Sequence, residues 1–113
     1  MWSIPEITPQ ELAARLRNGN RPYLLDVREP DEWDIVHIDG AVLMPITVLA
    51  EQGASALPPD LKPDTEVVVY CHHGARSAQV TAWLLRNGYT NVKNLSGGID
   101  EYAVAVEPPL PRY

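Results

Sequence analysis

The chain has 113 residues, a hydrophobic content of 45% and a formal net charge of −6. This length suits a single domain, and we expect residues 1–113 to form one, with its core in residues 8–106 and an extended tail in residues 107–113. The acidic balance argues against nucleic acid as a partner, because phosphate binding needs clustered Lys and Arg. The apolar runs are too short to cross a bilayer, so no membrane partner is expected.

Cys71 is the only cysteine, so no internal disulfide can form and a reducing compartment is favoured. The first residues, MWSIPEITPQ, carry no positive charge ahead of an apolar segment, as a secretory signal would. We therefore expect a cytoplasmic protein in which Cys71 is a free thiol.

Residues 8–19 carry the start and stop signals of a helix. Thr8 is the expected N-cap, and Pro9 occupies the first helical position. Glu11 would complete a capping box with Thr8, and Gly19 follows the end of the helix.

The next segments predict short elements. Residues 23–27 (YLLDV) form an apolar run that is typical of a buried strand. Residues 30–36 suit a short helical turn, with Trp33 as the inward-facing residue. Residues 41–45 read as a strand stopped by a proline, and residues 46–51 as a short helix.

The second half continues the alternation. Proline-rich residues 53–64 predict a surface loop, residues 66–71 (EVVVYC) a buried strand, and residues 75–87 an amphipathic helix. Residues 91–95 predict a last strand and residues 97–106 a last helix. Alternating strands and helices indicate an α/β fold with a central parallel sheet and helices on both faces.

Ligands of such sheets bind at the carboxyl ends of the strands, beside helix N-termini, and Cys71 occupies that position. The chain must curl between Cys71 and Arg76, which directs backbone N–H groups toward the sulfur and forms an anion cradle. The helix dipole and Arg76 add positive potential, so the thiolate is expected to be favoured over the thiol.

Gly74 permits a tight or left-handed turn in this loop. His72 and His73 can donate hydrogen bonds or carry partial positive charge near neutral pH. Two other interpretations of Cys71 are weaker. An inert buried cysteine would not be followed by so many polar residues, and adjacent histidines cannot easily converge on one metal ion.

Four segments, taken in order, resemble motifs of the rhodanese family of sulfurtransferases, and the resemblance covers nearly the whole chain. These segments are LLDVREPDEW (24–33), HIDGAVLMP (37–45), YCHHGARSAQVTAWLLRNGY (70–89) and NLSGGIDEY (94–102). The segment VEPPLPRY (106–113), which consists of Val106 and the tail, resembles the C-terminus of rhodanese domains fused to enzymes that activate ubiquitin-like sulfur carriers.

The resemblance implies a three-layer α/β fold and a rhodanese-type sulfurtransferase. Cys71 would carry sulfane sulfur as a persulfide, from a donor such as thiosulfate or a protein persulfide to a thiophilic acceptor. No cofactor beyond this covalent intermediate is implied. Partners would be the small-molecule donor and acceptor, with a sulfur-carrier or thioredoxin-like protein as a further partner.

The expected substrate-binding loop comprises His72, His73, Gly74, Ala75, Arg76 and Ser77. Asp26, Arg28 and Glu32 are expected to support this loop. Asp26 and Arg28 end the first buried strand, and we expect hydrogen bonds there and an ion pair with Glu32 or Glu29 rather than direct catalysis.

Two alternative functions stay open. One is a non-catalytic binding or regulatory module of the same fold, although family members of that kind have lost the cysteine that this chain retains. The other is a phosphatase or arsenate reductase. Such enzymes place five residues between Cys and Arg, whereas four separate Cys71 from Arg76 here. The smaller ring fits a sulfur atom better than a phosphate.

Overall fold

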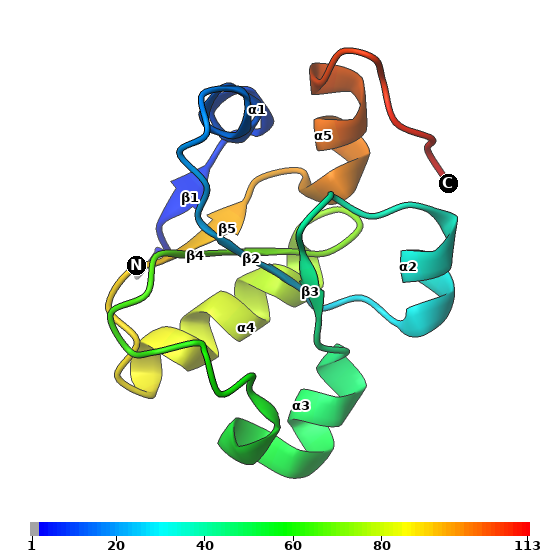
Figure 1. The fold of residues 1–113 in the computed structure, drawn as a ribbon. Helices are drawn as coiled ribbons and strands as arrows, with labels where there is room; N and C mark the ends of the chain where they lie inside the picture. Colours follow the sequence, from blue (N-terminus) through cyan, green and yellow to red (C-terminus); the bar gives the residue numbers. More distant parts are fainter. Residues whose placement is uncertain (1–2) are drawn as a thin grey trace.

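The computed structural model describes residues 3–113 as an α/β fold in which strands and helices alternate (Figure 1). The strands are β1 (Glu6–Ile7), β2 (Tyr23–Asp26), β3 (Val42–Leu43), β4 (Val67–Tyr70) and β5 (Val92–Leu95). The helices are α1 (Pro9–Arg17), α2 (Pro30–Ile35), α3 (Ile46–Gln52), α4 (Ala75–Arg86) and α5 (Gly98–Ala105), with a 3-10 turn, η1, at Gly53–Ala56.

Within residues 3–113 the strands form one parallel sheet in the order β1-β5-β4-β2-β3. The central strand, β4, is buried along its whole length and pairs with β2 and β5. Because all strands run the same way, the segments that follow β2, β4 and β5 meet at one edge of the sheet. The residues expected to form the functional site follow these strands.

Helices cover both faces of the sheet, which confirms the three-layer architecture (Figure 1). The side chains of β4 alternate between the faces. Val68 and Tyr70 pack into the cluster under α1 and α5. Val67, Val69 and the following Cys71 pack into the cluster under α3 and α4. This alternation directs the Cys71 side chain toward the face on which α4 begins.

Helix α1 begins as the sequence predicts. The Thr8 backbone N–H donates to Glu11 Oε1 at 2.9 Å, and the Glu11 N–H donates to Thr8 Oγ1 at 3.1 Å. The capping box is therefore confirmed. Such a box is worth about 0.5–2 kcal/mol to a helix, and it fixes the point at which the chain leaves β1.

Two features differ from the sequence-based expectation. Strand β1 is not predicted, because it is only two residues long and exists by pairing Ile7 with Leu95 of β5. Trp33 does not point into the core. It is half-buried and stacks on the exposed His37, with ring centroids 3.7 Å apart, because α2 lies beyond the edge strand β3 (Figure 1).

Candidate active site

Cys71 directly follows β4, at the carboxyl edge of the sheet. The chain then turns through His72, His73 and Gly74 and enters α4 at Ala75, as predicted. Gly74 has a φ of 110°, a left-handed conformation that glycine adopts without strain. The turn therefore needs a glycine at this position.

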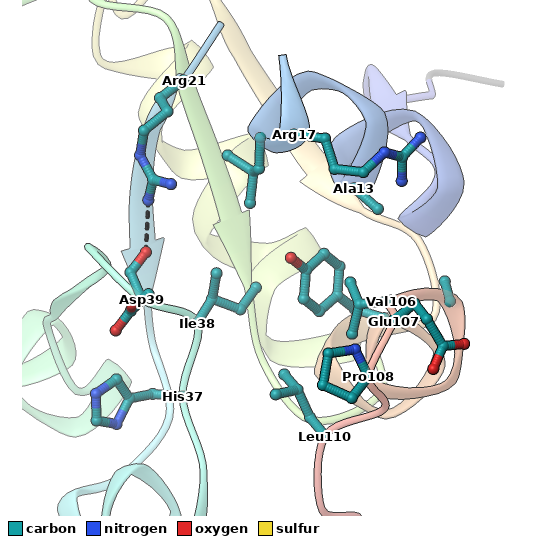
Figure 2. A pocket seen from close by; sticks show the side chains of 13 residues that line it. Ala13, Arg17, Arg21, His37, Ile38, Asp39, Val106, Glu107, Pro108 and Leu110 are labelled. Carbon is teal, nitrogen blue, oxygen red and sulfur yellow. Dashed lines mark hydrogen bonds between the residues drawn. The ribbon is translucent and has the colours of Figure 1, made fainter. Parts of the chain in front are cut away.

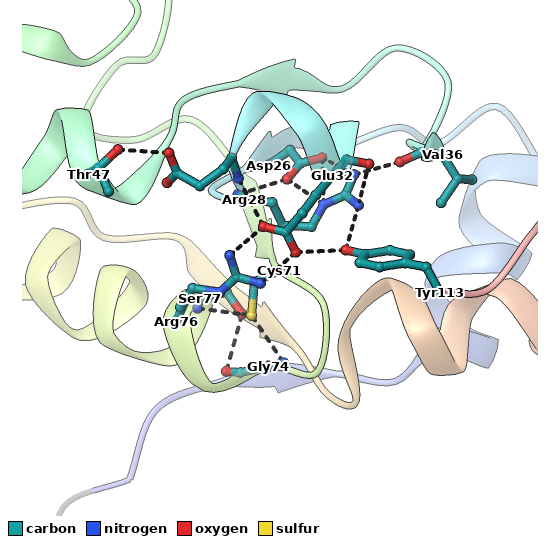
Figure 3. A network of polar contacts seen from close by, with 11 residues as sticks. Asp26, Arg28, Glu32, Val36, Thr47, Cys71, Gly74, Arg76, Ser77 and Tyr113 are labelled. Carbon is teal, nitrogen blue, oxygen red and sulfur yellow. Dashed lines mark hydrogen bonds and ion pairs between the residues drawn. The ribbon is translucent and has the colours of Figure 1, made fainter. Parts of the chain in front are cut away.

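The Cys71 sulfur lies inside this turn (Figure 3). The backbone N–H groups of Gly74 and Ser77 donate to Sγ at 3.1 and 3.4 Å. The Ser77 hydroxyl oxygen lies 3.3 Å from the same atom. These donors and the N-terminal end of α4 stabilise negative charge on the sulfur, as expected of a nucleophilic cysteine. Only 1% of the Cys71 surface is exposed.

Asn94 supports the loop from the neighbouring strand β5 and was not predicted as a site residue. Its Oδ1 atom lies within hydrogen-bond distance of the Ser77 hydroxyl. Its Nδ2 atom donates to the Gly74 carbonyl at 3.4 Å and to Glu6 Oε2 at 3.3 Å. The available sequence signal was the position of Asn94 in a predicted strand, because an amide that is buried there needs polar partners.

Arg76 is held by Glu32 of α2 rather than standing free beside the sulfur. Its Nη1 and Nη2 atoms donate to the Glu32 carboxylate at 2.6 and 2.9 Å. The hydrogen bond from Arg76 is the main reason why the pKa of Glu32 falls to about 2. The same bond raises the pKa of Arg76. The positive potential expected from Arg76 is therefore largely offset by the Glu32 charge.

Asp26 and Arg28 form a fully buried ion pair at the end of β2. Arg28 Nη2 donates to Asp26 Oδ2 at 2.7 Å and Nε donates to Oδ1 at 2.9 Å. The expected ion pair of Arg28 with Glu32 or Glu29 is wrong. Arg28 reaches the Glu32 backbone carbonyl instead, at 3.2 Å, because the Glu32 carboxylate pairs with Arg76.

The two histidines lie side by side, with ring centroids 3.9 Å apart. Burial, followed by the neighbouring His73, lowers the pKa of His72, which reduces its positive charge near neutral pH. His73 Nδ1 lies 3.7 Å from the Asp100 carboxylate of α5. The histidine pair therefore faces α5, and His72 supplies less charge than the sequence suggested.

Tyr113, in the tail, also reaches this group and was not predicted. Its ring stacks on His72, with centroids 3.8 Å apart and an angle of 7°. Its hydroxyl accepts from Arg28 Nη1 at 2.8 Å and donates to Glu32 Oε2 at 2.9 Å. No sequence signal identified it, because these contacts join residues more than forty positions apart in the chain.

A pocket of about 520 Å³ opens elsewhere, between α1, α5 and the segment before β3 (Figure 2). Arg17, Arg21 and Tyr102 are among the residues that line it. It contains none of residues 71–77, so it is separate from the thiol. Within residues 3–113, no cluster of His, Cys, Asp and Glu is arranged to hold a metal ion, and no helix is long and apolar enough to span a membrane.

The structure thus defines a class of α/β domain in which backbone N–H groups surround a buried thiol at the carboxyl edge of a parallel sheet. The family model for the rhodanese-like domain matches residues 8–105. The chain therefore belongs to the rhodanese-like domain family.

Relatives bear names of sulfurtransferases. The chain is 41% identical over 108 residues to the probable adenylyltransferase/sulfurtransferase MoeZ of Mycobacterium tuberculosis, covering 95% of this chain but 26% of MoeZ. It is 34% identical to a sulfurtransferase of Allochromatium vinosum, covering 88% of this chain and 89% of that protein. A human single-domain sulfurtransferase, TSTD1, has a similar structure, with a TM-score of 0.72, 30% identity and coverage of 87% and 94%. These relatives support sulfur transfer as the general chemistry.

Proposed function

We propose that the protein is a rhodanese-type sulfurtransferase that carries sulfane sulfur on Cys71. The observation that carries this proposal is the pair of backbone N–H groups, from Gly74 and Ser77, directed at the Cys71 sulfur. Fixed donors of this kind stabilise an anionic sulfur without reorganisation during the reaction. A thiolate held in this way is a nucleophile ready for transfer chemistry.

In the first half-reaction the Cys71 thiolate attacks the outer sulfur of the donor. A bond forms between Sγ and that sulfur, the donor's bond to it breaks, and the electron pair leaves with the rest of the donor. With thiosulfate the leaving group is sulfite. In the second half-reaction a thiophilic acceptor, such as cyanide or a thiolate, attacks the outer sulfur of the persulfide. The Cys71 thiolate then leaves and is regenerated.

The outer sulfur of the persulfide needs its own donors. Ala75 and Arg76 occupy the first two positions of α4. Backbone N–H groups at these positions have no acceptor within a helix. They are therefore available to a terminal sulfur anion, together with the positive end of the α4 dipole. In this proposal, residues 71–77 form the substrate loop and no cofactor takes part.

The loop length favours sulfur over phosphate as the transferred group, since four residues separate Cys71 from Arg76. The retained cysteine and its cradle also favour catalysis over a purely binding role. The sequence-based expectations of a cytoplasmic location and of a sulfur-carrier or thioredoxin-like partner belong to this proposal. The expectation of such a partner is supported by the similarity to a segment of MoeZ, a protein named for adenylyl and sulfur transfer.

Replacement of the thiol tests the proposal. Cys71→Ser removes the sole thiol and should reduce thiocyanate formation, from thiosulfate and cyanide or from glutathione persulfide and cyanide, to the rate measured without protein. Circular dichroism and the unfolding midpoint should stay close to those of the wild type, because the side chains are similar in size. Sulfur transfer above the protein-free rate in pure Cys71→Ser protein would exclude the proposed role of Cys71.

A further inference from the structure

The tail is attached to the domain at several points before it reaches the site. Leu110 of the tail packs against the core cluster under α1 and α5, beside Val106, the residue before the tail. The Leu110 N–H donates to the Ala103 carbonyl at 3.0 Å. Arg112 forms two hydrogen bonds of 2.9 Å with the Asp100 carboxylate. These contacts lead the last residues along α5 toward α2 (Figure 1).

Tyr113 then connects the tail with two other parts of the molecule. Its ring lies on His72 of the cysteine loop. Its hydroxyl joins Arg28, in the segment between β2 and α2, with Glu32 of α2 (Figure 3). Burial raises the pKa of Tyr113 to about 12. The hydroxyl is therefore protonated at neutral pH and donates a hydrogen bond to Glu32.

The groups around Tyr113 stand beside the thiol. Glu32 accepts the hydrogen bond from the Tyr113 hydroxyl and also forms the ion pair with Arg76 at the start of α4. Cys71 and His72 are adjacent in the loop, and the Cys71 residue is 1% exposed. Tyr113 itself is 38% exposed. The Tyr113 ring therefore lies on the residue that directly follows the buried Cys71.

We propose that Tyr113 is a specificity-determining residue of the Cys71 site. Its ring and the His72 ring form one wall of the approach to the thiol. The wall admits small sulfur donors, such as thiosulfate, and disfavours bulky ones, such as glutathione persulfide. This role in donor choice rests on the proposed sulfur transfer, whereas the steric role of the wall does not.

The ring and the hydroxyl of Tyr113 have separable effects. Tyr113→Phe keeps an aromatic ring over His72 but removes the hydrogen bonds to Arg28 and Glu32. Glu32 remains held by Arg76 and by the Glu29 N–H. The wall should therefore largely survive in Tyr113→Phe and be lost in Tyr113→Ala.

The test compares two alkylating reagents with the same reactive group, iodoacetamide and N-(1-pyrenyl)iodoacetamide. The rate of Cys71 modification by each is measured in the wild type, Tyr113→Phe and Tyr113→Ala. Tyr113→Ala should raise the ratio of the pyrenyl rate to the iodoacetamide rate by up to about tenfold, the size expected for loss of one aromatic pair. Tyr113→Phe should leave the ratio close to that of the wild type.

Tyr89→Ala is the matched control, because Tyr89 follows α4 at the opposite end of that helix. It should leave the ratio unchanged. An unchanged ratio in Tyr113→Ala, or an equal rise in Tyr89→Ala, would overturn the proposed wall. If Tyr113→Ala does not fold, His72→Ala removes the other half of the wall and should raise the ratio in the same way. An unchanged ratio there would also overturn it.

Sulfur-transfer assays separate this inference from the function on which it rests. Tyr113→Ala should raise kcat/KM for glutathione persulfide relative to that for thiosulfate. If neither donor loads Cys71 in any variant but the alkylation ratio rises, the wall stands and the proposed function fails. If both donors load Cys71 and the alkylation ratio does not change, the function stands and the wall fails.

Discussion

Glu32 of α2 and Arg76 of α4 form a two-point ion pair beside the cysteine loop, with nitrogen–oxygen distances of 2.6 and 2.9 Å. They are 44 positions apart in the chain. The pair joins α2 to the start of α4 and sets how much of the Arg76 charge the sulfur experiences. Because Glu32 offsets the charge of Arg76, the backbone N–H groups of the loop are the main groups that stabilise negative charge on the sulfur.

Removal of the Arg76 charge should slow the reaction of the thiol. Arg76→Gln leaves Glu32 unpaired near the loop, so the thiolate is disfavoured both by a lost cation and by an uncompensated anion. We expect Cys71 to react with iodoacetamide several-fold more slowly near pH 7. Arg86→Gln, at the other end of α4, is the control and should react like the wild type. Equal rates in all three proteins would contradict a role for Arg76.

The ion pair should also make stability depend on pH. The pKa of Glu32 is lowered from 4.5 to about 2, chiefly by Arg76, so the folded state favours the ionised carboxylate. The contribution of the ionised Glu32 to the free energy of unfolding is fully present above about pH 4.5 and is lost as the pH falls toward about 2. Glu32→Gln has no such contribution.

Urea unfolding of the wild type and Glu32→Gln over this range measures the effect. The wild type should be the more stable protein near neutral pH. The difference in free energy of unfolding between the two proteins should shrink as the pH falls from about 4.5 toward about 2. Other carboxylates titrate in both proteins, so their effects cancel in the comparison. A difference that stays constant down to about pH 2 would show that Glu32 does not gain stability from ionisation.

Gly98 should tolerate no side chain, because its backbone touches the cysteine loop. A Cβ atom there would overlap the backbone carbonyl groups of Cys71 and His72. Gly88 is the matched control, since it also has a positive φ but open space around it. Gly88→Ala should cost about 1–2 kcal/mol for the conformation alone.

Gly98→Ala should cost clearly more than Gly88→Ala in urea unfolding, because the loop backbone must move as well. It should also change the iodoacetamide reactivity of Cys71, which Gly88→Ala should leave alone. Equal stability losses with unchanged thiol reactivity would mean that α5 does not hold the loop in place.

The buried pair Asp26–Arg28 should matter more for stability than an exposed one. Arg28→Met leaves the Asp26 carboxylate buried without its cation, which costs about 3–5 kcal/mol. Arg15→Met breaks the partly exposed pair with Glu66 and should cost about 1 kcal/mol or less. Urea denaturation of both variants and of the wild type measures the two losses in free energy of unfolding. Similar losses would contradict a supporting role for Arg28 beneath the site.

Local signals in the sequence predicted much of this structure. The capping box at Thr8 and the strand, turn and helix around Cys71 involve residues close together in the chain, so their side-chain chemistry and periodicity can be read directly. Strand β1 could not be read in this way, because its two residues become a strand only by pairing with β5. Trp33 was misplaced because apolar character alone does not say which side of a short helix meets the core.

The partners of the charged site residues were equally hard to predict. The sequence suggested Glu32 or Glu29 for Arg28, yet Asp26 is its partner and Glu32 pairs with Arg76. Tyr113 reaches Arg28 across 85 positions of sequence. Such pairings follow from how the loops converge at the edge of the sheet, which spacing along the chain does not reveal.

Mass spectrometry of the Cys71 peptide tests the central claim most directly. The purified protein is incubated with thiosulfate or glutathione persulfide, the excess donor is removed, and the protein is digested without reductant. The proposed function predicts a mass increase of one sulfur atom on Cys71 that disappears when cyanide is added, with thiocyanate released. An unmodified Cys71 after treatment with both donors, or added sulfur that cyanide cannot remove, would contradict it.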